Sequence, residues 1–177
     1  MTALRDMTID EFCDVHDACT KGRDWARTHC TTIQECWEKL PNPHWIAWVA
    51  DQSGVLTDNE KWEFGLFCCE LVRPQLTDFR LLAAISILCL WLAGEAGLQE
   101  LKLASWGASI ACDEEEDGNY AASTVATVVR VPKKASSAYV PCILELMHYA
   151  YRAGADPARL ANWLRTFTKP NFTKKEG

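Results

Sequence analysis

The chain has 177 residues, 49% of them hydrophobic, and it carries a formal net charge of −6. This length and apolar content are typical of one domain with a real core, and they exclude a chain that is disordered over most of its length. The polar N-terminal stretch MTALRDMTIDEFCDVHD argues against a secretory signal, and the longest apolar stretch, 81–93, is too short to span a membrane.

Helix-capping signals mark the predicted elements in chain order. Three are capping boxes: Thr8-Ile-Asp-Glu11, Thr32-Ile-Gln-Glu35 and Thr57-Asp-Asn-Glu60. Two are a cap followed by a first-turn proline: Asn42-Pro43 and Asp156-Pro157. The sixth is the pair Thr77-Asp78, which begins a helix that Gly94 ends. These signals, with the spacing of the apolar residues, predict helices near 8–20, 23–29, 32–40, 43–51, 58–72, 78–93, 97–112, 136–153 and 157–167.

One segment, 123–131, has the β-branched content of a strand. Because no partner strand is predicted, we favour a helix there and leave a short irregular or strand-like segment open. Short connections between helices predict an all-α fold, an antiparallel multi-helix array or bundle. We expect a single helical domain over 1–167, divided into an acidic part, 1–118, and a basic part, 119–167, and followed by a flexible basic tail, 168–177.

Four tryptophans within 24 residues, Trp25, Trp37, Trp45 and Trp48, stand out in the N-terminal part. Such a density could provide a stacking platform for nucleic-acid bases. The capping signals on either side place these rings on helices, and large apolar side chains at helical positions are typical of a core. The cluster therefore predicts the core of the helical fold.

The same segment resembles a phage- and bacterium-associated immunity-protein family, the fifth immunity-like class. The similarity covers about 12–112, with a looser fit from Ser136, and is carried by Asp17-Ala-Cys, Gly22-x-x-Trp25, Thr32-x-Gln-Glu-x-Trp37, His44-Trp45-x-x-Trp48-Val-Ala, Leu71-Val-Arg-Pro74 and the stretch from Thr77-Asp-Phe-Arg80 to Gly94-Glu95. The chain departs from the long Ala-rich middle of the family in DEEEDGN and TVATVV. The resemblance implies a helical fold and a role in neutralising a toxin.

Nine cysteines and four histidines raise the question of a metal or catalytic site. Cys13, His16 and Cys19 lie at i, i+3 and i+6, but the third points away from the first two on a helix, and the chain has no C-x-x-C pair. No local signature supports a nucleophile with its base, and His148 is interpreted as structural. With no export signal, we expect reduced thiols packed as small apolar groups in a cytoplasm, with no metal, no cofactor and no enzymatic activity.

Charge is divided unevenly along the chain. Residues 1–118 hold nine cationic side chains and 21 carboxylates, a net −12, whereas 119–177 hold nine and three, a net +6. The acidic part ends in a run that is the predicted partner-binding site: Asp113, Glu114, Glu115, Glu116 and Asp117. An acidic surface suits a basic cleft, because complementary charge speeds encounter and fixes register.

Charge, the missing catalytic signature and the resemblance together favour a non-enzymatic inhibitor of the phage or mobile-element type in a bacterial cytoplasm. Its expected partner is a protein with a basic cleft, a toxin nuclease or a host defence nuclease such as a CRISPR effector. The negative charge disfavours direct binding of nucleic acid. A metal- or thiol-dependent enzyme, a homodimer, and a DNA-associated regulator remain open, the last using basic C-terminal residues: Arg130, Lys133, Lys134, Arg152, Arg159, Arg165, Lys169, Lys174 and Lys175.

Overall fold

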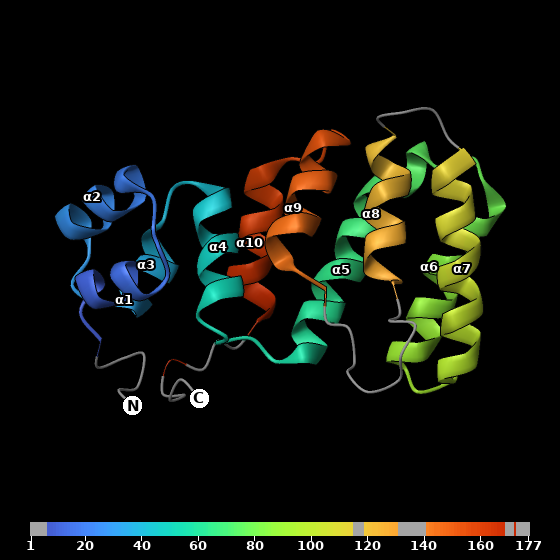
Figure 1. Ribbon diagram of the computed structural model, residues 1–177, viewed down its shortest axis with the longest axis horizontal. Helices are drawn as coiled ribbons and strands as arrows, with labels where there is room; N and C mark the ends of the chain where they lie inside the picture. The colour runs from blue at the N-terminus through green and yellow to red at the C-terminus, as the bar shows by residue number, and fades with distance from the viewer. Residues whose placement is uncertain (1–6, 115–118, 131–140, 169–171, 173–177) are drawn as a thin grey trace. The chain divides into compact units, whose positions relative to one another are not determined.

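The computed structural model describes residues 7–114, 119–130, 141–168 and 172. Its described residues form ten α-helices and a short 3₁₀ helix and contain no strand: α1 (Ile9–Val15), α2 (Thr20–His29), α3 (Ile33–Lys39), α4 (Pro43–Gln52), α5 (Asp58–Val72), η2 (Arg73–Gln75), α6 (Phe79–Leu92), α7 (Leu98–Glu114), α8 (Tyr120–Val128), α9 (Ile143–Arg152) and α10 (Pro157–Phe167) (Figure 1). The fold is an all-α array, as predicted. Within the described ranges no helix is long and apolar enough to cross a membrane.

Several helices begin at the residues that the capping signals predict. Thr8 and Glu11 form a complete capping box at the start of α1, and Asn42 and Asp78 cap α4 and α6 through their side chains. The second box forms only in part, because the Thr32 hydroxyl accepts the Glu35 amide while the Glu35 carboxylate accepts hydrogen bonds from the preceding residue, Thr31. Local hydrogen bonding of this kind can be predicted from a few neighbouring residues.

The segment with strand-like composition is helical. Asn119 caps α8, and its side-chain oxygen accepts the amide of Ala122. Val125 and Val128 on α8 are fully buried, so packing against other helices outweighs the β propensity of the segment. The predicted helix 136–153 begins at Ile143, with Cys142 as its N-cap, and 136–140 lie outside the described residues.

Contacts divide the chain into two compact units, one formed by 1–57 with 161–177 and the other by 58–160. The residue at which the charge changes sign, 118, falls inside the second unit. In the second unit, α5 packs against α6, α8 and α9, and α7 packs against α6 and α8. Helices α5 and α8 approach closely at Gly65 of α5, where an added Cβ would lie 2.8 Å from a methyl group of Val128.

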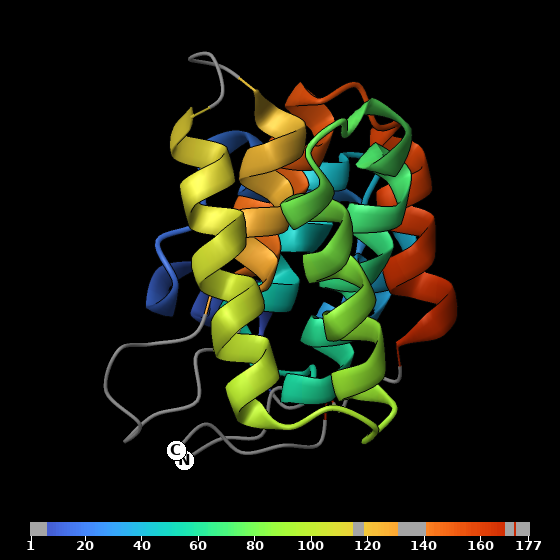
Figure 2. The same ribbon diagram turned by 90° about the vertical axis from the view of Figure 1, so that its right-hand side faces the viewer.

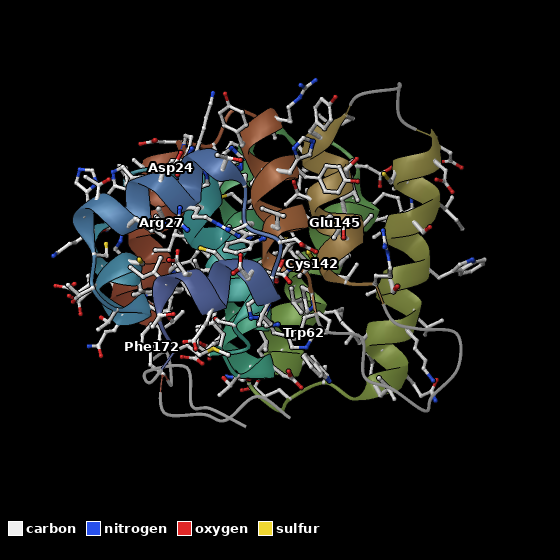
Figure 3. The ribbon with its side chains drawn as sticks, turned by 60° about the vertical axis from the view of Figure 1, so that its left-hand side comes forward. Asp24, Arg27, Trp62, Cys142, Glu145 and Phe172 are labelled. Atoms are coloured by element: carbon white, nitrogen blue, oxygen red, sulfur yellow. The ribbon has the colours of Figure 1, made fainter. Side chains whose placement is uncertain are left out.

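In the first unit, two ion pairs join α1 and α2. The Arg23 guanidinium lies 2.7 Å from the Asp14 carboxylate, and that of Arg27 lies 2.6 Å from Asp10. Figure 3 labels Arg27 beside Asp24 on α2. These short helices bury few residues each, so contacts between helices contribute more to their stability than intrinsic propensity does.

The four clustered tryptophans all contribute to this first unit. Trp37 is 4% exposed and contacts Phe172, whereas the other three tryptophans are partly exposed. Trp45 faces Trp25 of α2, and Trp48 packs edge-on against Phe12 of α1. Phe172 and Thr168 are buried in the segment whose composition predicts a flexible tail, and 169–171 and 173–177 lie outside the described residues.

Candidate interaction surface

Helices α6 and α7 form an antiparallel pair on the second unit, and Figure 2 looks onto this pair. The Asp78 carboxylate accepts the amide of Arg80 at 2.7 Å, which fixes the start of α6. The Arg80 guanidinium also lies 2.5 Å from the Glu114 carboxylate, on the last residue of α7. The beginning of α6 and the end of α7 are therefore held side by side.

The acidic end of α7 is defined as Asp113, Glu114 and the sequence run that continues to Asp117. Of this predicted site, the structure describes Asp113 and Glu114. Asp113 and Glu114 are exposed, and the last turn of α7 contains no basic residue. The C-terminal end of a helix already carries partial negative charge, so carboxylates there oppose the stability of the helix. Glu115, Glu116 and Asp117 lie outside the described residues.

Arg80 neutralises this end only in part. Its hydrogen bonds to Asp78 hold the pKa of that carboxyl below its usual value, and the two carboxylates raise the pKa of the Arg80 guanidinium. Arg80 thus forms ion pairs with both Asp78 and Glu114, while Asp113 forms no ion pair with any described residue. The acidic end of α7 retains net negative charge, which is a suitable environment for a cationic group of a partner.

Large apolar side chains are exposed on α6 and α7. Phe79 is 76% exposed, and Leu103 and Trp106 are each 68% exposed. Their role as candidate surface residues was not predicted from the sequence. The sequence does place Leu103 and Trp106 on the side of α7 opposite three residues that are buried: Leu101, Ala108 and Ala111. Which of the two sides is covered by other helices is known only from the structure.

Of the cysteines that the sequence suggests for a metal site, the structure brings Cys30 and Cys36 together and leaves Cys19 apart. Cys13, Cys30 and Cys36 are buried in the first unit, with the thiols of Cys30 and Cys36 in hydrogen-bonding contact, whereas Cys19 is exposed at the start of α2. Burial raises the pKa of the Cys13 and Cys36 thiols, which is typical of inert, packed cysteines. Within the described part of the chain, no group of three or more His, Cys, Asp or Glu residues has an arrangement that could hold a metal ion.

The remaining candidates for chemistry have structural surroundings. His148, which the sequence analysis interprets as structural, is exposed on α9, and its ring lies 5.7 Å from the ring of Tyr149. The Cys112 and Ser123 side chains meet at 3.8 Å between α7 and α8. This thiol–hydroxyl contact joins two helices of the second unit.

Two of the basic C-terminal residues interact within their own units. The Arg152 guanidinium lies 4.7 Å above the Tyr120 ring and donates to its hydroxyl, and Arg165 donates to backbone carbonyls of α3. Lys133, Lys134, Lys169, Lys174 and Lys175 lie outside the described residues.

Known proteins provide no relative with which this geometry can be compared. No family model, curated protein or solved structure matches the chain. The similarity of 12–112 to the immunity-protein family therefore stays a prediction that depends on the residues quoted for it. What the structure contributes is the all-α array and the exposed surface of α6 and α7.

Proposed function

We propose that this protein is a non-enzymatic inhibitor of the phage or mobile-element type, and that the acidic end of α7 docks in a basic cleft of an enzyme acting on nucleic acid. The observation that carries the proposal is the placing of Asp113 and Glu114 at the negative end of a helix whose last turn has no basic residue. Carboxylates in this position cost the helix stability, which favours a role outside the fold.

The physical basis of inhibition is competition for the same charged cleft. Nucleases bind phosphates through cationic clefts, and a run of carboxylates on a protein can occupy the path of the nucleic-acid backbone. The target is a toxin nuclease or a host defence nuclease such as a CRISPR effector.

The test neutralises part of the acidic end of α7 and compares it with an equal change elsewhere. The triple variant Glu115→Gln/Glu116→Gln/Asp117→Asn removes three carboxylates and leaves Asp113 and Glu114 in place. The control, Glu38→Gln/Glu63→Gln/Glu95→Gln, removes three exposed carboxylates from other parts of the chain. Each protein is used to capture partners from host lysate, and captured nucleases are assayed with and without the purified protein.

We expect the wild type and the control variant to capture and inhibit the same nuclease, and the acidic-end variant to lose at least about tenfold in affinity, as is typical when close charge pairs are removed. Equal capture by all three proteins would show that the acidic end of α7 is not the docking site. A captured nuclease that stays fully active would refute inhibition as the function.

A further inference from the structure

The outer face of α7 carries a stripe of residues with a self-complementary pattern. Positions spaced by three and four residues lie along one side of this helix: Gln99, Lys102, Trp106, Ser109 and Asp113. Trp106 is 68% exposed, and Ser109 and Asp113 are exposed as well. After Gln99, the stripe contains a cation, Lys102, then a large aromatic residue and a small hydroxyl residue, and it ends at an anion, Asp113.

A two-fold axis that passes beside α7, level with the point between residues 107 and 108, would pair this stripe with the same stripe of a second copy. Two antiparallel copies of the helix then place Lys102 opposite Asp113, and Trp106 opposite Ser109, in both directions. Opposite charges meet at the ends, and a large side chain meets a small one near the centre. Neither Lys102 nor Asp113 forms an ion pair with a described residue of its own chain, so both are available for this contact.

Helix α6 adds a second apolar residue at the level of the same axis. A Cβ on Gly107 of α7 would lie 3.9 Å from the Cβ of Arg80, so the first turn of α6 is level with the middle of the stripe. Phe79 is in that turn and is 76% exposed. A two-fold axis perpendicular to an antiparallel α7 pair puts both α6 helices on the same side of the pair, so Phe79 of each copy would lie at the level of the axis on that side.

We propose that the chain forms a two-fold symmetric homodimer in which α6 and α7 of one copy pack against α6 and α7 of a second copy. Trp106, Leu103 and Phe79 form the apolar centre, and two Lys102–Asp113 pairs fix the register. Exposed aromatic residues at the centre with complementary charges around them are typical of specific interfaces. This self-association uses Asp113, which also belongs to the acidic end of α7. The test of the proposed inhibition changes only Glu115, Glu116 and Asp117, so a failure of one proposal is distinguishable from a failure of the other.

Charge reversal tests the pairing directly. In Lys102→Asp the stripe is negative at both ends, and in Asp113→Lys it is positive at both ends, so each single variant should self-associate at least about tenfold more weakly than the wild type. The double variant Lys102→Asp/Asp113→Lys restores opposite charges and should recover the dimer. An equimolar mixture of the two single variants should form a heterodimer, measured by sedimentation equilibrium with one variant labelled.

A second pair of variants tests the apolar centre. Trp106→Glu should yield a monomer with unchanged helical circular dichroism, because this side chain is exposed in the single chain. Phe167→Glu changes another exposed aromatic residue, which is 63% exposed on α10, and should leave the dimer intact. A wild type that stays monomeric up to about 100 μM, or a dimer that survives both Trp106→Glu and the single charge reversals, would overturn the proposal.

Discussion

At the scale of single residues, two helical glycines provide a matched test of packing in the second unit. Gly65→Ala would bring a Cβ within 2.8 Å of Val128, and this overpacking should lower the free energy of unfolding by about 1–3 kcal/mol. Gly107→Ala meets nothing closer than 3.9 Å and should raise it by about 0.5–1 kcal/mol, because alanine loses less backbone entropy in a helix. Urea unfolding of both variants checks the sign. Equal effects would show that α5 and α8 are not in close contact.

A second prediction at this scale concerns pH. Hydrogen bonds from the Thr31 amide and hydroxyl lower the pKa of Glu35 from 4.5 to about 2. A lowered pKa in the folded state stabilises the protein above the unfolded pKa, and this contribution is lost as the pH falls toward 2. Glu35→Gln should therefore destabilise at pH 7 and have little effect near pH 2. The control is Glu38→Gln, which removes an exposed carboxylate one turn away and leaves the hydrogen bonds between Thr31 and Glu35 in place. Urea midpoints of both variants at pH 7 and near pH 2 check the prediction.

At the scale of elements, Arg165 holds the end of α3 against α10. Its guanidinium donates to the carbonyl oxygens of Trp37, at 3.1 Å, and Leu40, which satisfies acceptors that the helix leaves open. Arg165→Met keeps the apolar stem and removes both bonds, at a cost of about 1.5–3 kcal/mol. Hydrogen exchange of α3 should be faster in this variant than in the wild type. It should be unchanged in Arg159→Met, which alters another arginine of α10. Unchanged exchange in both variants would show that Arg165 does not hold the end of α3.

Elements were predictable from the sequence where their signals are local. Thr8, Asn42 and Asp78 mark helix starts because a cap depends on residues within the next turn. The burial of Cys13 and Cys36, and the exposure of Trp106, depend on which helix faces cover one another, and no spacing along the chain reports that. The acidic end of α7 was found by composition alone, whereas the exposed apolar side chains of α6 and α7 required the structure.

At the scale of the whole molecule, the two proposals together predict a stoichiometry. Because the two α7 helices of the proposed dimer are antiparallel, their acidic ends lie at opposite ends of the pair. Glu114 of one copy lies opposite Leu101 of the other, so the two ends are about 20 Å apart along the helices. Each dimer should therefore bind two partner molecules without competition between them. Light scattering and calorimetry should give a 2:2 complex for the wild type and a 1:1 complex of similar affinity per site for Trp106→Glu. If a wild-type dimer binds a single partner molecule, the docking surface lies on the two-fold axis. If Trp106→Glu loses partner binding, the exposed face of α6 and α7 contacts the partner and not a second copy of the chain.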